Sequence, residues 1–321
     1  MYDQNKIFPN KTVICTPNYF GQDAEFALGT SPYGPFTESI EPWNYLAADR
    51  AREESADWGN NLFVKKGLGT LVKTYGERLT KLYSIRFTET FRAIKEISYS
   101  DVVTVKDTSG NVFTGDACII TVPVSVLEAG KISFTPALPD PYRYALKALK
   151  LGSYKKLAIQ LTITPKEIED NVNYYLYNEN PNGIWQFYRL SYFPKNTFVV
   201  HTAGNFAAKL DNMADHKVFE LFKSTFKKAY NEEPIFVEKY GITKWDKNDY
   251  ALGAYSYTAP VGFDITNSKP LNSRKQMAIP IDNKIFFAGE AYNIKAYGTL
   301  HGAYIDGQDA AENALRFLGS S

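Results

Sequence analysis

The chain has 321 residues, 44% of them hydrophobic, and a formal net charge of +1 from 36 basic and 35 acidic side chains. This length and composition predict a folded chain with one large or two ordinary domains. The balanced charge argues against charge-driven disorder and against a nucleic-acid partner. With two cysteines and three histidines, neither a disulfide scaffold nor a metal site is expected.

The sequence shows no pattern typical of a secretory signal or of a membrane-spanning segment. Residues 1–15 contain no apolar stretch typical of a secretory signal. The longest apolar run, residues 117–127, is interrupted by Thr121, Pro123 and Ser125 and is too short to cross a bilayer. We therefore expect a cytoplasmic location and no membrane partner.

In the first half of the chain, hydrophobic spacing predicts two helices and several strands. The helices cover residues 41–55 and 67–79, and the second has apolar residues at helical spacing. A short strand is predicted at residues 85–87, followed by a hairpin of residues 102–105 and 112–114 around a turn. Residues 118–122 form an apolar run that ends at Pro123, as a buried strand would.

The second half adds strands at residues 156–163 and 196–203 and a helix within residues 211–230. The last unit is a strand at residues 284–288, joined by a short loop to a helix at residues 298–317. Helices and strands alternate without a regular strand–helix–strand rhythm. We therefore expect a mixed α/β (α+β) fold with two interleaved domains.

The final predicted helix has Gly298, Gly302 and Gly307 in its first three turns. A glycine inside a helix costs about 1 kcal/mol relative to alanine, so these positions need a reason. One reason is close approach of another backbone or a flat ligand, and the other is tight helix–sheet packing without a ligand. The helix start also offers N–H groups and the positive end of the helix dipole, which suit an anion or an electron-rich oxygen.

Residues 286–290 (FFAGE) and 297–304 (YGTLHGAY) resemble the C-terminal flavin-binding segment of the flavin-dependent amine oxidases. That family includes monoamine oxidases, polyamine oxidases and the lysine-specific histone demethylases. Residues 66–72, 119–127 and 132–139 are similar to the family's glycine-led helix start, its central strand and the exit from that strand. Trp245 with residues 253–257 resembles the segment on the substrate side of the flavin.

The resemblance implies FAD as the cofactor, and Ala254 stands where monoamine oxidases carry a cysteine joined to the flavin, so FAD would be noncovalent. It implies that Glu290 contacts the ribityl–pyrophosphate part. Thr299 and Leu300 would offer backbone N–H groups to the flavin N1/C2=O edge, where reduced flavin gathers negative charge. The other cofactor-binding positions implied by the matched motifs are Phe91, whose backbone would hold the adenine edge, Pro123, Gly289 and Ala303.

Two residues are implied to be catalytic. Lys156 corresponds to the family lysine that holds a water near flavin N5, and a lysine in an apolar pocket can have a lowered pKa. The alternative is a solvated strand lysine, and Lys155 offers the same residue type one position away. Tyr255 corresponds to one wall of an aromatic cage for the amine, whereas the alternative is a plain strand aromatic. The opposite wall falls at Thr299, which argues against a simple monoamine oxidase.

The strand–GxGxxG–helix unit that binds the pyrophosphate in such enzymes is missing. Gly67 and Gly69 are followed by Val72 where the third glycine is required. The chain therefore resembles roughly the last two-thirds of such an enzyme. Three accounts are open: a separate chain supplies the dinucleotide-binding unit, the chain is a truncated and inactive flavoprotein fragment, or it is an amine-binding module without redox chemistry.

These inferences combine into an expected FAD-dependent amine oxidase-like oxidoreductase, or a subunit of one. A hydride would pass from the carbon beside the nitrogen of an amine or amino acid to flavin N5, with imine hydrolysis and H₂O₂ release. The expected partners are a small-molecule amine and O₂. The predicted substrate domain comprises residues 1–61 and 149–250, and the partial FAD-binding domain comprises residues 62–148 and 251–321.

Overall fold

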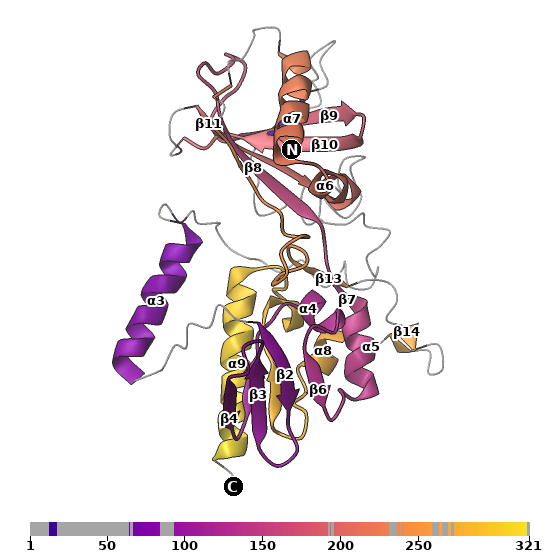
Figure 1. Ribbon diagram of the computed structural model, residues 1–321. Coiled ribbons are helices and arrows are strands. Elements are labelled where there is room, and N and C mark those ends of the chain that lie inside the picture. Colours follow the sequence, from indigo (N-terminus) through magenta and orange to yellow (C-terminus); the bar gives the residue numbers. More distant parts are fainter. Residues whose placement is uncertain are drawn as a thin grey trace.

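The computed structural model describes residues 13–17, 64, 67–83, 93–191, 193, 196–230, 236–237, 239–258, 263–264, 269–270 and 273–319. Within these residues the chain forms two lobes, one above the other in Figure 1. The predicted helix at residues 41–55, the strand at residues 85–87 and Phe91 lie outside the described residues.

The upper lobe is built on a six-stranded sheet with the order β1-β9-β10-β11-β8-β12, in which all neighbours are antiparallel. Its strands are β1 (Val13–Pro17), β8 (Tyr154–Gln160), β9 (Val172–Glu179), β10 (Asn182–Tyr188), β11 (Thr197–Ala203) and β12 (Gly241–Ile242). In β8, buried residues alternate with more exposed ones, which is the pattern of a strand with one face in a core.

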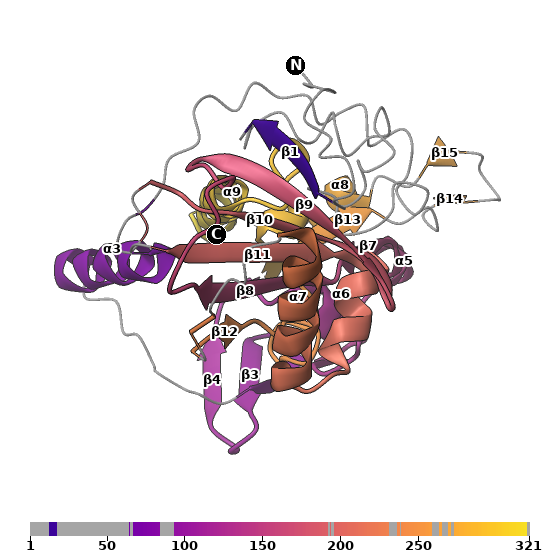
Figure 2. The same ribbon diagram turned by 90° about the horizontal axis from the view of Figure 1, so that it is seen from above.

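One face of this sheet is covered by two helices, α6 (Gly204–Asp211) and α7 (Asp215–Ala229), as Figure 2 shows. The core between them is aromatic: the Trp185 and Phe206 rings have centroids 4.9 Å apart, and Phe187 and Phe226 are 5.3 Å apart. Edge-to-face pairs of this kind add to the stabilisation from buried area. The sheet and its helices therefore form a firm base for the residues on the opposite face.

The lower lobe contains a four-stranded sheet with the order β4-β3-β2-β6 and a parallel pair formed by β5 and β16. The strands are β2 (Ile94–Ser98), β3 (Val103–Asp107), β4 (Val112–Gly115), β5 (Cys118–Ile120), β6 (Ser133–Thr135) and β16 (Ile285–Phe287). The helices are α4 (Val124–Glu128), α5 (Asp140–Ala148), α8 (Ser273–Met277) and α9 (Leu300–Leu318), with the short 3₁₀ helix η4 (Glu290–Tyr292).

Two separate hydrophobic cores correspond to the two lobes. One draws on residues 157–236, and the other joins residues 97–149 to residues 277–292. The strand β7 (Leu149–Leu151) pairs with β13 (Ser256–Thr258) where the chain passes between the lobes, and β14 (Phe263–Asp264) pairs with β15 (Lys269–Pro270). The domain boundaries given above stay a prediction.

Most predicted elements in the described residues are confirmed. The hairpin is β3–β4, the two strands of the second half are β8 and β11, and the final strand–helix unit is β16–α9. The predicted helix at residues 211–230 begins only at Asp215, because a turn at residues 212–214 separates it from α6. β5 ends at Ile120, two residues early, and Ile119 is 38% exposed, so this strand is less buried than its composition indicates.

The amphipathic helix predicted at residues 67–79 is α3 (Leu68–Tyr83), but its apolar side is not in a core. Leu68, Leu71 and Val72 are each about half exposed. Figure 1 shows α3 to one side of the lower lobe. Its Tyr75 ring lies 6.1 Å from the Tyr304 ring of α9.

The glycines of α9 differ in what surrounds them. A Cβ at Gly302 would lie 1.9 Å from the Ala296 carbonyl oxygen. Around a Cβ at Gly307, no atom of the described residues beyond its own stretch of helix lies within 4 Å. Close approach of another backbone is therefore the reason for glycine at position 302. It is not the reason at position 307.

We predict that Gly302→Ala lowers the free energy of unfolding by about 1–3 kcal/mol, because the methyl group overlaps the Ala296 carbonyl. Gly307→Ala is the control in the same helix and should raise it by up to about 1 kcal/mol through helix propensity. Urea unfolding followed by circular dichroism measures both. Equal changes in the free energy of unfolding for the two substitutions would contradict a close contact between residue 302 and the Ala296 carbonyl.

Candidate active site

Residues from three distant segments form one continuous row. Lys156 Nζ lies 5.7 Å from the centre of the Tyr154 ring, and the Tyr154 and Tyr255 rings have centroids 6.0 Å apart. A Cβ at Gly298 would lie 3.2 Å from Tyr255, so the tyrosine packs directly on this turn. Gly298 has a φ of +74°, a conformation that favours glycine. The row therefore leads from β8 to the turn before α9.

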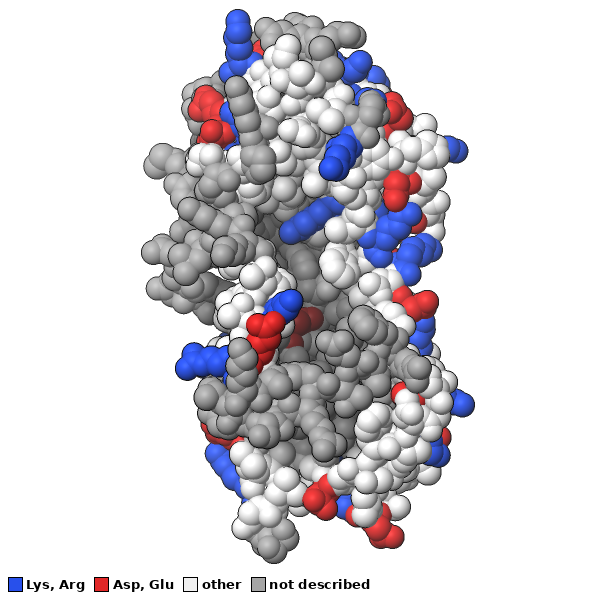
Figure 3. Space-filling model, turned by 60° about the vertical axis from the view of Figure 1, so that its left-hand side comes forward, with Lys and Arg blue, Asp and Glu red and all other residues white. Residues whose placement is uncertain are grey.

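The surface of the molecule is hollowed between the lobes, with charged side chains of both signs beside the hollow in Figure 3. β8 belongs to the upper lobe and α9 to the lower lobe (Figure 1). The row from Lys156 to Gly298 therefore connects the two lobes. A ligand that contacts Lys156 at one end of the row and the turn before α9 at the other would contact both lobes.

The carboxylate of Glu290 holds the turn that leads into α9. Its Oε1 accepts a hydrogen bond from the Ser256 N–H at 3.0 Å, and its Oε2 accepts from Ser256 Oγ at 2.7 Å and from the Gly298 N–H at 2.6 Å. Hydrogen bonds to a charged acceptor are roughly twice as strong as neutral ones. Glu290 therefore fixes β13 against the turn, and its contact with the ribityl–pyrophosphate part of FAD stays a prediction.

Thr299 is the N-cap of α9. Its Oγ1 accepts from the Gly302 N–H at 3.0 Å and donates to the Ala296 carbonyl at 2.6 Å, while its carbonyl accepts from the Ala303 N–H at 3.1 Å. For the Leu300 N–H, the described part of the chain provides no acceptor, and Leu300 is 47% exposed. The first turn of α9 also carries the positive end of the helix dipole.

Two further predicted residues lie at the ends of neighbouring strands. Gly289 follows β16 with a φ of +150°, and its N–H donates to Asp306 Oδ2 at 2.9 Å. Pro123 precedes α4, and its carbonyl accepts from the Val126 N–H at 3.0 Å. Because β5 and β16 are parallel, both residues lie beyond the carboxyl ends of these two strands, on the same side of the pair.

The structure separates the two adjacent lysines of β8. Lys155 is fully buried, forms an ion pair with Asp211 and donates to the Thr243 carbonyl at 2.8 Å. Lys156 points to the opposite face of the sheet and is exposed there, beside Tyr154. Desolvation by the surrounding protein nevertheless lowers the pKa of the Lys156 amine. Lys156, not Lys155, therefore belongs to the row that reaches α9.

Several contributing residues were not found by sequence reasoning. His201 contacts Tyr154, and Arg274, which is 2% exposed, lies 3.7 Å over the Tyr297 ring and donates to Ser256 Oγ at 2.9 Å. Tyr154 lies within the matched motif around Lys156, and that position was the available signal. No local pattern marks His201 or Arg274, because their partners come from other strands.

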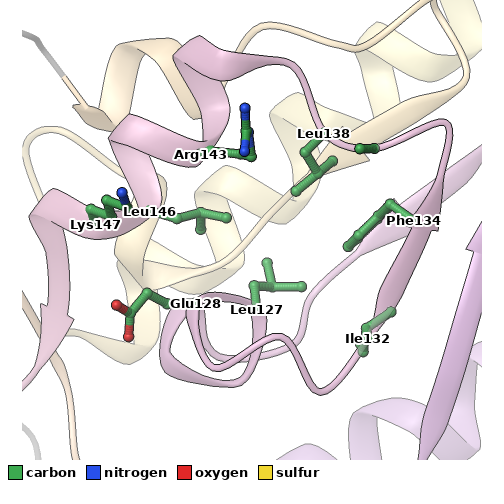
Figure 4. Close-up of a pocket in the computed structure, with 9 residues that line it drawn as sticks. Leu127, Glu128, Ile132, Phe134, Leu138, Arg143, Leu146 and Lys147 are labelled. Carbon is green, nitrogen blue, oxygen red and sulfur yellow. The ribbon is translucent and has the colours of Figure 1, made fainter.

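Two cavities of the described residues lie away from this row. One of about 270 Å³ is lined by Leu127, Ile132, Phe134, Leu138 and Leu146, with Glu128, Arg143 and Lys147 around it (Figure 4). Another of about 250 Å³ lies beside α9 and includes Asp306, whose pKa is raised to about 6 chiefly by burial. None of the predicted site residues lines either cavity.

The described residues contain neither a membrane-spanning helix nor a cluster of metal ligands. No helix there is both long and apolar enough to span a membrane. No group of three or more His, Cys, Asp or Glu side chains there is placed to hold a metal ion.

Comparison with known proteins identifies the family of the chain. Residues 44–315 match the family described as flavin containing amine oxidoreductase, and the chain belongs to this family. It is 30% identical over 284 residues to polyamine oxidase 4 of Oryza sativa subsp. japonica, covering 86% of this chain and 55% of the relative. It is 25% identical over 289 residues to human lysine-specific histone demethylase 2, covering 85% of this chain and 34% of the relative.

The fold is also shared with a solved amine oxidase. Cyclohexylamine oxidase from Brevibacterium oxydans IH-35A aligns with a TM-score of 0.50 at 17% identity, covering 70% of this chain and 48% of that one. This comparison confirms the mixed α/β class. The chain spans about half the length of the polyamine oxidases it matches, 54% to 55%.

We predict that Glu290→Gln lowers the free energy of unfolding by about 1–3 kcal/mol, because one amide oxygen cannot replace two oxygens that accept three hydrogen bonds. Glu312→Gln on exposed α9 surface is the matched control and should change stability by less than about 0.5 kcal/mol. Chemical denaturation of both variants tests this. A Glu290 variant as stable as the Glu312 variant would contradict the role assigned to the carboxylate.

Proposed function

We propose that this chain forms the substrate-binding part and the flavin-ring end of an FAD-dependent amine oxidase, with FAD bound noncovalently. The observation that carries the proposal is the row of Lys156, Tyr154 and Tyr255 ending at the start of α9. Membership of a flavin-containing family supports a flavin at that end. Ala254, which cannot form a thioether, supports a noncovalent cofactor.

The residues of the row have distinct roles in this proposal. The Tyr154 and Tyr255 rings attract the cationic form of an amine. The N-terminal turn of α9 stabilises negative charge at the flavin N1/C2=O edge. Lys156, with its lowered pKa, holds a water or moves a proton near the reacting carbon. A flavin held at the start of α9 would supply the redox chemistry, which is hydride transfer from the carbon beside the amine nitrogen and reoxidation by O₂ to give H₂O₂.

An amine is favoured over an amino acid as the substrate. Several relatives are named polyamine oxidases, and among the described site residues no arginine faces the row. The Arg274 guanidinium is buried against Tyr297 and bonded to Ser256. The described site therefore offers aromatic faces for a cation and no arginine for a carboxylate.

A further unit that binds the pyrophosphate is part of the proposal. β16 is buried along its length, yet β5 is the one strand that pairs with it in the described residues, apart from a single bridge between Ile281 and Ile285. Parallel sheets are ordinarily larger and covered on both faces. We propose that a strand–GxGxxG–helix unit, from a second chain or from another part of a longer protein, completes this sheet and the FAD site.

The experiment is a visible absorption spectrum of the purified chain, alone and co-purified with a candidate GxGxxG protein. The expected result is flavin absorbance released by denaturation, which shows noncovalent binding, and stronger absorbance with the second unit. Flavin that stays attached after denaturation would overturn the noncovalent assignment. No flavin in either preparation would overturn the oxidase and leave an inactive fragment or an amine-binding module.

We predict that Lys156→Met slows flavin reduction by amine or its reoxidation by O₂ by roughly 10²-fold without unfolding the chain. Lys155→Met is the contrasting neighbour, because breaking its buried pair with Asp211 should destabilise the fold by about 3–5 kcal/mol. Stopped-flow absorbance and thermal unfolding separate the two effects. Unchanged flavin kinetics in Lys156→Met would remove this lysine from the mechanism.

A further inference from the structure

Two segments that pass between the lobes are attached to each other by backbone hydrogen bonds. One lies between β7 and β8, and the other, residues 243–255, lies between β12 and β13 (Figure 1). The Gly152 N–H donates to the Tyr255 carbonyl at 3.1 Å, and the Ala254 N–H donates to the Gly152 carbonyl at 2.9 Å. The 243–255 segment carries Trp245 and Tyr255, so its attachment determines where both aromatic side chains lie.

The start of the 243–255 segment is attached to β8. The Thr243 N–H donates to the Lys156 carbonyl at 3.0 Å, and Thr243 Oγ1 accepts from the Lys156 N–H at 2.8 Å. The Thr243 carbonyl accepts from Lys155 Nζ at 2.8 Å. The segment is therefore fixed at both ends, and the contacts of its middle part determine how firmly Trp245 is placed.

Asp246 attaches the middle part of the segment. Its Oδ2 accepts a hydrogen bond from Ser153 Oγ at 2.5 Å. Its Oδ1 is buried, and no described residue offers that oxygen a hydrogen bond. A buried oxygen without a partner is more costly on a charged carboxylate than on a neutral carboxyl group. The neighbouring Lys244 pairs with Asp215 of α7 at 2.9 Å instead.

The charges around Asp246 are unbalanced. Lys155 on β8 and Asp211 on α6 form a buried ion pair, with side chains 0% and 4% exposed. Burial raises the pKa of Asp246, and the charge of Asp211 acts in the same direction. The Ser153 hydrogen bond and the charges of Lys155 and Lys247 oppose this shift without cancelling it. Ionised Asp246 therefore places a second carboxylate near one buried lysine.

The raised pKa fixes the sign of the pH dependence. Above the ordinary value of 3.8, the folded chain binds more protons at Asp246 than the unfolded chain does. The stability that protonated Asp246 contributes is therefore present at low pH and is lost as the pH rises through the folded-state pKa. Local opening that returns this carboxyl group to water follows the same rule.

We propose that Asp246 is a positioning residue that holds the 243–255 segment, with Trp245 and Tyr255, against Ser153, most firmly when its carboxyl group carries a proton. In that state Lys155 and Asp211 form a balanced pair. The aromatic side of the candidate site is therefore held more loosely as the pH rises. This inference goes beyond the proposed function, because it applies with or without flavin.

Hydrogen–deuterium exchange of peptides that cover residues 243–255 tests the proposal in the full chain without flavin. Wild type and Asp246→Asn are compared at the same pH, so that the intrinsic pH dependence of exchange cancels. The Asn side chain accepts the Ser153 hydrogen bond without a charge. The variant should therefore exchange several-fold more slowly than wild type at pH 7.5, and the difference should shrink at pH 4.5. Asp246→Ala, which loses the bond, should exchange faster than Asp246→Asn at both values.

Asp249→Asn is the matched control in the same segment. The Asp249 carboxylate is exposed, and its hydrogen bond from Lys131 lowers its pKa, so it stays ionised from pH 4.5 to pH 7.5. This variant should therefore keep the pH dependence that wild type shows relative to Asp246→Asn.

The fluorescence of Trp245 reports whether the contact positions the site. The chain has four tryptophans, so the signal lost in Trp245→Phe identifies this one. In wild type, acrylamide should quench the Trp245 signal more strongly at pH 7.5 than at pH 4.5. In Asp246→Asn the quenching should be equal at the two values.

Three results would overturn the proposal: equal exchange of wild type and Asp246→Asn at both pH values, equal exchange of Asp246→Ala and Asp246→Asn, or Trp245 quenching in wild type that does not change with pH. A chain that shows the expected exchange and quenching but binds no flavin would refute the oxidase and keep this inference.

Discussion

One carboxylate connects the elements on which the candidate site depends. Glu290 accepts hydrogen bonds from Ser256 and from Gly298, and it thereby joins β13 to the turn before α9. Tyr255 precedes Ser256 and packs on Gly298, so its ring position follows from the same contacts. The helix start, the aromatic wall and the strand that carries it are therefore placed relative to one another by a single charged group.

The second constraint is the two-residue alternation of β8. It directs Lys155 into the upper core, where Asp211 neutralises it, and it directs Lys156 to the opposite face with Tyr154. The buried pair stabilises only with both partners present, whereas the outward lysine is available for chemistry. One strand thus supplies both a structural anchor and a candidate catalytic group, and the aromatic core behind it holds both in position.

The described residues of the lower lobe include a small parallel pair of strands and a helix whose apolar side is largely exposed. In the described residues, the parallel pair of β5 and β16 has no third strand, and the apolar side of α3 is about half exposed. Apolar area left in water contributes nothing to stability, so a unit that covers it gains roughly 25 cal/mol for each Å² buried. The chain spans about half the length of the polyamine oxidases it matches.

The sequence by itself determined most of the local secondary structure and the family to which the chain belongs. Hydrophobic patterning identified α3, β8 and β11, and the motifs of residues 286–307 identified the family, because both signals lie within short stretches of chain. Only the tertiary structure decided which lysine of β8 faces the site, why glycine is needed at Gly302 but not at Gly307, and that His201 bridges two tyrosines. These features depend on strand register and on backbones that meet from distant segments, and no local pattern encodes such contacts.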